Sequence, residues 1–446
     1  MFFRQCYSNI LNWINEGSKY LQVMGPKGVG KTYLVREALK ETRKDYIEIS
    51  DKNVNDFLEL IKLVKKNGYD SVRENISFTF SHQLRMDTII YIDVDTDTIP
   101  LDTILSFVSG LFNRCIIVSM PSNTDALLDT EIIYIDPMNF YEFLLAFSVS
   151  EYQINELKEA FLSKTEVEKK VHRRMLNLFY SYTILGGLPK VVDNYLKTKD
   201  YFSSSLIQNE IIDYYKDRLE KAQGAKKQYL DVFNQIPVEL DDLNKRFFVA
   251  HLVKKMHFDR FVNNFNYLSN LGVAYESHAL DKLNIPLDEE SKDVLFKYYM
   301  YDVGLLTAMY GKETQLSLIN NERRLRSGAI VENAVAENLI SYGITPYYYN
   351  TKEEGEFDFV IESNDEVIPF IVKSGKKYAR KVCKLSRLDD HDYNFTNEFV
   401  FSDRNIYTED TVINYPIYMI MFIDELSNKE KAVPKKKSRE LDVYLL

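Results

Sequence analysis

Short β-branched runs alternate with helical stretches over the first 145 residues of the chain. This alternation is the pattern of an α/β unit with a parallel sheet. Most of the runs are almost continuously apolar, as expected of strands that are buried on both faces. We therefore predict parallel strands at residues 20–24, 46–49, 88–92, 115–119 and 131–135.

The pattern changes after residue 150. Residues 151–235 are charged and carry apolar residues at three- and four-residue spacing, which predicts a series of helices. The segment Gly186-Gly187-Leu188-Pro189 predicts a break between two of them. Residues 236–280 then read as two helices, a third helix at 258–271 and a strand after Gly272, an order similar to that of a winged helix.

A second, smaller α/β domain is predicted from about residue 325. A helix at 329–341 precedes the β-branched runs, and another helix begins at 376. The runs predict strands at 345–349, 356–361, 367–373, 397–401 and 415–423.

Composition narrows the class of protein. The chain has 446 residues, of which 45% are hydrophobic and 27% charged, ordinary values for a globular protein. The net charge of −10 argues against a general nucleic-acid coat protein, because phosphates are neutralised by clustered Lys and Arg. No apolar run approaches the ~20 residues of a membrane helix. With three scattered cysteines and no secretory signal, we expect a reduced, cytoplasmic protein that makes no membrane contact.

One motif carries a specific chemistry. It matches G-x-x-x-x-G-K-[ST], follows a predicted strand and opens a predicted helix, which is the context of a P-loop. Glycines let backbone N–H groups surround an anion, and the helix start adds the positive end of its dipole. Lys31 would reach the β- and γ-phosphates and the Thr32 hydroxyl would ligate Mg²⁺. The predicted nucleotide-binding residues are Gly25, Pro26, Lys27, Gly28, Val29, Gly30, Lys31 and Thr32.

A P-loop needs a carboxylate at the end of a neighbouring strand to hold the magnesium shell. The run at 88–92 is followed by Asp93, which we predict to be this acid. The sequence therefore predicts that ATP and Mg²⁺ bind, with Thr32 and Asp93 on the metal side.

These features resemble a family of bacterial and archaeal AAA-type ATPases of the AAA+ superfamily. The resemblance implies a P-loop NTPase core, a helical and winged-helix region, and a C-terminal domain of unknown function that is similar to restriction endonucleases. It divides the chain into a nucleotide-binding domain (1–148), a helical region (149–235), a winged-helix-like region (236–310) and an endonuclease-like domain (325–446). Besides the P-loop and Asp93, the matching segments are 119–122, 135–144, 186–189, 296–306, 328–333 and 368–375.

Two departures from the family bear on catalysis. The family usually has a water-orienting glutamate directly after the magnesium-side aspartate, but this position is Val94, and Asp95 is a displaced substitute. The arginine expected before the segment at 135 is absent from residues 125–131, and such an arginine is worth ~10³–10⁵ in rate. Ser119 and Ser122 are candidates for a sensor-like contact with the γ-phosphate, although a serine at the end of a strand more often forms hydrogen bonds in a turn. We expect ATP to act mainly as a conformational ligand with slow hydrolysis.

The endonuclease resemblance implies a degenerate metal site. Its helix acid would be Glu332, its strand acid Asp358 and its lysine Lys373, but Ile371 replaces the second carboxylate. Since Mg²⁺ prefers oxygen ligands, this loss predicts weak metal binding and little nuclease activity. Glu356 and Glu362 fall on the face of Asp358 by strand alternation, so either is an alternative ligand.

A basic run follows this site, with seven Lys or Arg and no acid between Lys373 and Arg387. On a helix, one face would carry Lys377, Arg380, Lys381, Lys384 and Arg387. This face is either a nucleic-acid contact or a solvated surface. The helix predicted at 258–268 has Arg260 as its one cation, which favours a packing module over DNA recognition. The alternative to a nucleotide-regulated protein is an ATP-regulated nuclease or a DNA-binding protein.

Overall fold

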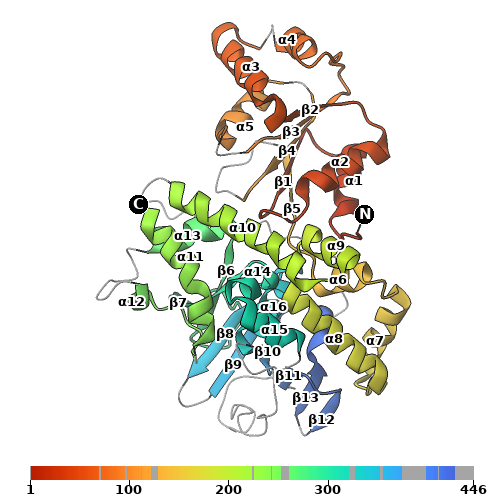
Figure 1. Cartoon of the computed structure of the whole chain (residues 1–446), viewed down its shortest axis with the longest axis vertical. Coiled ribbons are helices and arrows are strands. Elements are labelled where there is room, and N and C mark those ends of the chain that lie inside the picture. Colours follow the sequence, from red (N-terminus) through yellow and green to blue (C-terminus); the bar gives the residue numbers. More distant parts are fainter. Residues whose placement is uncertain are drawn as a thin grey trace. The chain divides into compact units, whose positions relative to one another are not determined.

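The computed structural model describes two compact units, one made of residues 3–136 with 270–272 and the other of most of the remaining chain (Figure 1). Each unit has its own sheet, of five and of eight strands. The residues described are 2–69, 72–95, 98–111, 113–121, 129–222, 226–242, 244–252, 261–320, 327–351, 355–373, 398–409 and 411–426.

The first unit contains the predicted parallel sheet. Its strand order is β2-β3-β4-β1-β5, and every neighbouring pair is parallel. Two strands have the predicted ends, and the other three differ from prediction by one residue at one or both ends. The strands are β1 (Tyr20–Met24), β2 (Tyr46–Ser50), β3 (Ile89–Asp93), β4 (Cys115–Ser119) and β5 (Thr130–Tyr134).

Helices and a buried apolar core fix this sheet. Ile90 and Ile92 of β3 and Ile117 of β4 are fully buried and belong to one cluster with Phe57 of α3. The core holds the carboxyl ends of β1, β3 and β4 at one edge of the sheet, where a P-loop protein binds its ligand. The helices are α1 (Tyr7–Glu16), α2 (Lys31–Thr42), η1 (Asp51–Asn53), α3 (Val54–Asn67), α4 (Val72–Thr79) and α5 (Leu101–Ser109).

The second unit opens with the predicted helices. Gly186 ends α8 at a φ of +71°, and Pro189 begins α9, so the predicted break is confirmed. The helices are α6 (Phe140–Ala146), α7 (Glu151–Ser163), α8 (Lys169–Leu185), α9 (Pro189–Thr198), α10 (Tyr201–Lys221) and α11 (Lys226–Asp241).

An eight-stranded mixed sheet follows, in the order β12-β13-β11-β10-β9-β8-β6-β7. β6 pairs antiparallel with β7 and parallel with β8, so the hairpin of the predicted winged-helix region shares a sheet with the strands predicted as endonuclease-like. The division of residues 149–446 into three domains stays a prediction. The strands are β6 (Ala274–Leu280), β7 (Ser291–Met300), β8 (Tyr347–Thr351), β9 (Gly355–Ser363), β10 (Glu366–Val372), β11 (Glu398–Ser402), β12 (Tyr407–Glu409) and β13 (Val412–Pro416).

One predicted strand is wrong over most of its length. Residues 417–423, predicted as part of a strand, belong to a 3₁₀ helix, η4 (Ile417–Glu425), whose apolar residues are buried. A short continuous apolar run fits a buried strand and a buried helix equally well. The other helices of this unit are α12 (Val249–Leu252), α13 (Val262–Asn270), α14 (Val303–Met309), α15 (Lys312–Ile319) and α16 (Ser327–Ser341). In the part of the chain described, no helix is long and apolar enough to span a bilayer.

Three matching segments of the family resemblance meet inside the second unit. Asp302 is buried and caps α14, accepting hydrogen bonds from the Leu305 N–H at 2.9 Å and the Gly187 N–H at 2.7 Å. The Gly187 carbonyl accepts from the Met138 N–H at 2.8 Å. A Cβ atom at residue 187 would lie 2.1 Å from the Met138 carbonyl oxygen, so only glycine fits. These segments therefore act in packing.

Candidate functional site

The P-loop connects the buried strand β1 to α2. Gly28 and Gly30 have φ values of +91° and +96°, which other residues rarely adopt. Gly25 passes so close to the end of β5 that an added Cβ would lie 2.2 Å from the Ile135 carbonyl oxygen. α2 starts at Lys31 and has no acid in its first turn, so the positive end of the helix faces no competing side-chain charge of its own.

Lys31 lies folded back on its own loop. Its Nζ donates to the carbonyl oxygens of Gly25 at 2.7 Å and Pro26 at 2.8 Å. Burial lowers the pKa of Lys31 to about 7, and the attraction of Asp93 opposes this shift. The two hydrogen bonds hold the Lys31 side chain at the loop.

Asp93 ends β3, as predicted, and its side chain is partly buried. Its Oδ2 accepts a hydrogen bond from the Tyr91 hydroxyl at 2.9 Å. This bond and the burial raise the pKa of Tyr91 far above its usual value, so the tyrosine stays a neutral donor. Asp93 and the Thr32 hydroxyl are oxygen ligands of the type that Mg²⁺ prefers, and Lys31 and the loop amides suit phosphate. The residues present fit a magnesium nucleotide.

The residues after Asp93 leave the strand. Val94 is buried in the apolar core of the first unit. The Asp95 N–H donates to Asp51 Oδ1 at 3.1 Å, and its carbonyl accepts from the Thr98 and Ile99 N–H groups, so Asp95 begins a turn. Because β3 ends at Asp93, strand alternation does not extend to Asp95. The catalytic role of Asp95 stays a prediction.

Ser119 ends β4, beside the P-loop strand, where it is paired in register with Met24. It is buried, and its Oγ accepts a hydrogen bond from Gln22 Nε2 at 3.2 Å. The sensor-like role of Ser119 also stays a prediction. Ser122 and residues 125–128 lie outside the described part of the chain.

Sequence reasoning missed Arg4, which is buried next to the P-loop. Its Nη1 donates to the Val29 carbonyl at 2.9 Å, and its Nη2 donates to the Asp136 carbonyl at 2.5 Å. These bonds tie the phosphate loop to the segment that follows β5. The partners lie 25 and 132 residues away along the chain, so no local pattern could have revealed the contact.

The second predicted constellation is a buried ion cluster. Glu332 of α16 and Asp358 of β9 are both buried and influence each other's charge. Lys245 Nζ donates to Glu332 Oε1, while Lys297 Nζ lies 3.6 Å from Glu332 Oε2. Asp358 Oδ2 accepts from the Val372 N–H at 2.8 Å. The structure thus brings Glu332 and Asp358 together as predicted, and adds two lysines that were not foreseen.

The two carboxyl groups respond differently to this setting. Burial raises the pKa of Asp358 to about 6, with a further contribution from Glu332. Burial would also raise the pKa of Glu332, but Lys245 and Lys297 outweigh it and the net shift is downward. The charge of Lys373, at the end of β10, acts on both groups in the same direction.

These residues do not fit a divalent metal ion. Ile371, in the place of the second carboxylate, belongs to an apolar cluster with Tyr349 and Phe357. Glu356 is exposed, and Glu362 Oε2 accepts a hydrogen bond from the Leu287 N–H at 2.9 Å. No group of three or more His, Cys, Asp or Glu that could hold a metal is found among the residues described. The basic face formed by Lys377, Arg380, Lys381, Lys384 and Arg387 lies outside those residues.

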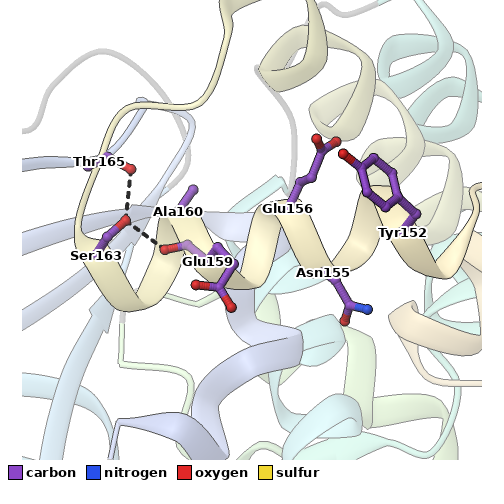
Figure 2. A pocket seen from close by; sticks show the side chains of 7 residues that line it. All are labelled: Tyr152, Asn155, Glu156, Glu159, Ala160, Ser163 and Thr165. Carbon is purple, nitrogen blue, oxygen red and sulfur yellow. Dashed lines mark hydrogen bonds between the residues drawn. The ribbon is translucent and has the colours of Figure 1, made fainter.

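A shallow groove of about 380 Å³ lies on α7, far in the sequence from both constellations (Figure 2). Tyr152, Glu156 and Glu159 line it, and Ser163 Oγ and Thr165 Oγ1 are hydrogen-bonded at 2.9 Å on its edge. The lining contains no cation, so the groove does not suit a phosphate.

Two family models match parts of the chain. Residues 176–316 match a domain of unknown function (DUF8612), and residues 327–419 match another (DUF4143). Each covers less than half of the chain, and neither description gives an activity. No curated protein matches the chain by sequence.

Solved structures of ATPases are similar at low identity. A Walker-type ATPase of Pyrococcus abyssi is 14% identical with a TM-score of 0.42, over 70% of this chain and 96% of that one. A signal transduction ATPase (STAND) with a tetratricopeptide repeat sensor from Pyrococcus horikoshii is 12% identical with a TM-score of 0.28, over 76% and 48%. AMPPCP-bound DnaA from Aquifex aeolicus is 13% identical with a TM-score of 0.27, over 60% and 87%. At these TM-scores the likeness adds nothing to the argument from the site itself.

Proposed function

We propose that the protein binds Mg·ATP at its P-loop and uses the nucleotide mainly as a conformational ligand, with slow hydrolysis. One observation carries the proposal: Lys31 bonds to a glycine loop whose Gly28 and Gly30 have positive φ values, and Asp93 ends β3 at the same edge of the parallel sheet. This arrangement supplies backbone donors, a cation and a metal-side carboxylate in one place. The choice of adenine rests on the family resemblance.

Each group has a separate task in this proposal. The amides of the loop and of the first turn of α2 bind phosphate oxygens, and Lys31 leaves the Gly25 and Pro26 carbonyls to reach the outer phosphates. Thr32 and Asp93 hold the magnesium ion and its water shell, and the ion, when bound, neutralises phosphate charge. Arg4 keeps the Val29 carbonyl in place, so the loop need not reorganise when the ligand arrives.

Slow hydrolysis follows from two missing groups. Val94 cannot orient water, and residues 125–131 offer no arginine to stabilise the charge of the transition state. Lys245 and Lys297 beside Glu332 weigh against the alternative of an ATP-regulated, metal-dependent nuclease.

Calorimetric titration with Mg·ATP tests the proposal, with Lys31→Ala as the variant and Lys40→Ala as a matched control on the same helix. Lys40 is exposed and pairs only with Glu37 among the ion pairs given by the structure. We expect Lys31→Ala to weaken binding about 10- to 100-fold, as for a lost charge-assisted hydrogen bond. Lys40→Ala should bind as the wild type does. Equal affinities in all three proteins would refute the proposal.

A steady-state ATPase assay on the same proteins tests the second half. We expect fewer than about one turnover per second, at or below the low end of typical enzymes. If the wild type turns over several ATP molecules per second and Lys31→Ala abolishes this activity, hydrolysis is not slow and the proposed conformational role is wrong. Nucleotide binding at the P-loop would still be supported.

A further inference from the structure

The buried ion cluster of the second unit is built from a surplus of cations, whereas the endonuclease resemblance implies a surplus of acids. Its members come from five different segments. Lys245 lies between α11 and α12, Lys297 on β7, Glu332 on α16 and Asp358 on β9, with Lys373 just after β10. None of these residues belongs to the P-loop, so the cluster is separate from the proposed nucleotide site.

Lys297 is the most enclosed cation of this cluster, with 1% of its surface exposed. Its Nζ lies 3.6 Å from Glu332 Oε2 and 3.4 Å from the Asp358 carbonyl oxygen. The same Nζ lies 4.9 Å from the centre of the Tyr348 ring and 5.9 Å from that of Phe359. Carboxylate, carbonyl and aromatic faces all attract a cation, so this position is built to hold a positive charge.

The second cation completes the neutralisation. Lys245 donates to the other oxygen of Glu332, and the Tyr299 hydroxyl donates to Oε2 at 3.4 Å. Burial alone would lower the pKa of Lys245, but Glu332 and Asp358 raise it above its usual value. Both oxygens of Glu332 therefore have protein donors beside them.

We propose that the ammonium groups of Lys297 and Lys245 occupy the place that a divalent cation would take between Glu332 and Asp358. The cluster is then an internal, metal-free ion group that joins α16 to β7 and β9. It excludes divalent cations because the ammonium groups repel a second cation in a medium of low dielectric constant.

A simple structural ion pair would not become a metal-binding site on losing its lysine. If Lys297 stands in for a metal, its removal should convert the cluster into a cation site, because the two buried carboxylates would lose their most enclosed counter-ion and keep only Lys245 and Lys373. Lys297→Met keeps an unbranched side chain and removes the charge. Lys297→Arg is the matched control, because it keeps the charge and should still exclude metal.

The experiment titrates the full-length, nucleotide-free protein with MnCl₂, following free Mn²⁺ by electron paramagnetic resonance and the melting temperature in parallel. We expect Lys297→Met to bind one additional Mn²⁺ with a dissociation constant below about 1 mM, the range of weak carboxylate sites. Its melting temperature should rise with Mn²⁺. Wild type and Lys297→Arg should lack this additional ion, and the double variant Lys297→Met, Glu332→Gln should lose it.

Two results would overturn the proposal. One is a wild-type Mn²⁺ site that Glu332→Gln removes, since the lysines would then not exclude metal. The other is a folded Lys297→Met that binds no additional ion. If Lys297→Met folds only when Mn²⁺ is present, that rescue supports the proposal. If it does not fold in either buffer, Lys245→Met decides, because that side chain is 20% exposed and its loss is better tolerated. An additional Mn²⁺ ion in Lys245→Met supports the proposal, and none overturns it.

Discussion

The P-loop and the buried ion cluster both place a lysine beside a carboxylate, yet the surroundings give the two lysines opposite roles. Lys31 bonds to two carbonyls of a glycine loop, which are neutral partners that a phosphate can replace. Lys297 faces the carboxylate of Glu332 and two aromatic rings. We expect no diffusing ligand to displace these buried partners from the ammonium group. We therefore expect Lys31, whose hydrogen-bond partners are neutral, to bind a ligand, and Lys297, whose partners are buried, to have a structural role.

The largest effect expected from this comparison is on stability. Lys297→Ala should lower the free energy of unfolding by about 3–5 kcal/mol, because it removes the most enclosed of the counter-ions of two buried carboxylates. Nucleotide affinity of the folded fraction should not change. Chemical denaturation followed by calorimetry measures both quantities. A loss below about 1 kcal/mol would mean that the two lysines do not differ in the way described.

Lys31→Ala should give the reverse pattern. The affinity for Mg·ATP should fall about 10- to 100-fold, while the free energy of unfolding changes by less than about 1 kcal/mol. The lost carbonyl hydrogen bonds are offset by relief from burying an ammonium group, the same burial that lowers the pKa of Lys31 to about 7. Denaturation curves of Lys31→Ala and Lys297→Ala, recorded together, make the comparison direct.

Arg4→Ala should have a smaller effect on affinity, about tenfold, because Arg4 positions the loop rather than contacting the phosphates. Its two backbone partners, the carbonyls of Val29 and Asp136, would lose a charged donor. Arg4→Lys should recover part of the affinity, since an ammonium group can replace one of the two bonds. If Arg4→Ala binds nucleotide as tightly as the wild type, the loop holds its shape without this contact.

Asp302 is a buried carboxylate of a different kind from Glu332, because its partners are backbone N–H groups and not lysines. Burial raises the pKa of Asp302 to about 7, against the N–H groups of Gly187, Leu305 and Gly304, whereas the lysines lower the pKa of Glu332. Between about pH 4 and 7 the folded state therefore keeps a proton on Asp302 that the unfolded state has released. The stabilisation of the folded state by this proton is fully present below about pH 4 and is lost as the pH rises to about 7.

Asp302→Asn should remove that pH dependence. The free energies of unfolding of wild type and variant, compared between pH 4 and 7, should diverge by at most about 1.4 kcal/mol per pH unit. The difference isolates Asp302 from Asp358, whose raised pKa acts in the same direction in both proteins. Parallel pH profiles would mean that Asp302 does not take up this proton.

Local features of the sequence were enough to predict the strands and the glycine loop at which we propose that nucleotide binds. The apolar run of β1, the spacing of Gly25 and Gly30, and the acid after β3 are contiguous patterns with a known geometry. Longer contacts could not be predicted in this way. Arg4 and its Asp136 partner are 132 residues apart, and Lys245 and Glu332 are 87 residues apart.

The misassigned η4 segment has a different physical cause. Its run from Ile417 to Ile423 is buried on every side, so neither a two-residue nor a 3.6-residue period is imprinted on it. Burial from all directions removes the signal from which the type of element is inferred. The family resemblance named Glu332 and Asp358, and the charge of Glu332 acts on Asp358 in the structure. It could not predict Lys297, because that lysine is not part of the motif that the resemblance implies.

The self-contact of Lys31 has a consequence for which ligands the loop accepts. A small anion that touches only the loop amides leaves the Lys31 ammonium group bonded to the carbonyls of Gly25 and Pro26. The attraction between this ammonium group and the anion then adds nothing to the binding free energy. In a longer chain of phosphates, the outer phosphates can replace the two carbonyls as partners of Lys31 and so bind its ammonium group directly. We therefore expect the loop to bind a triphosphate more tightly than orthophosphate.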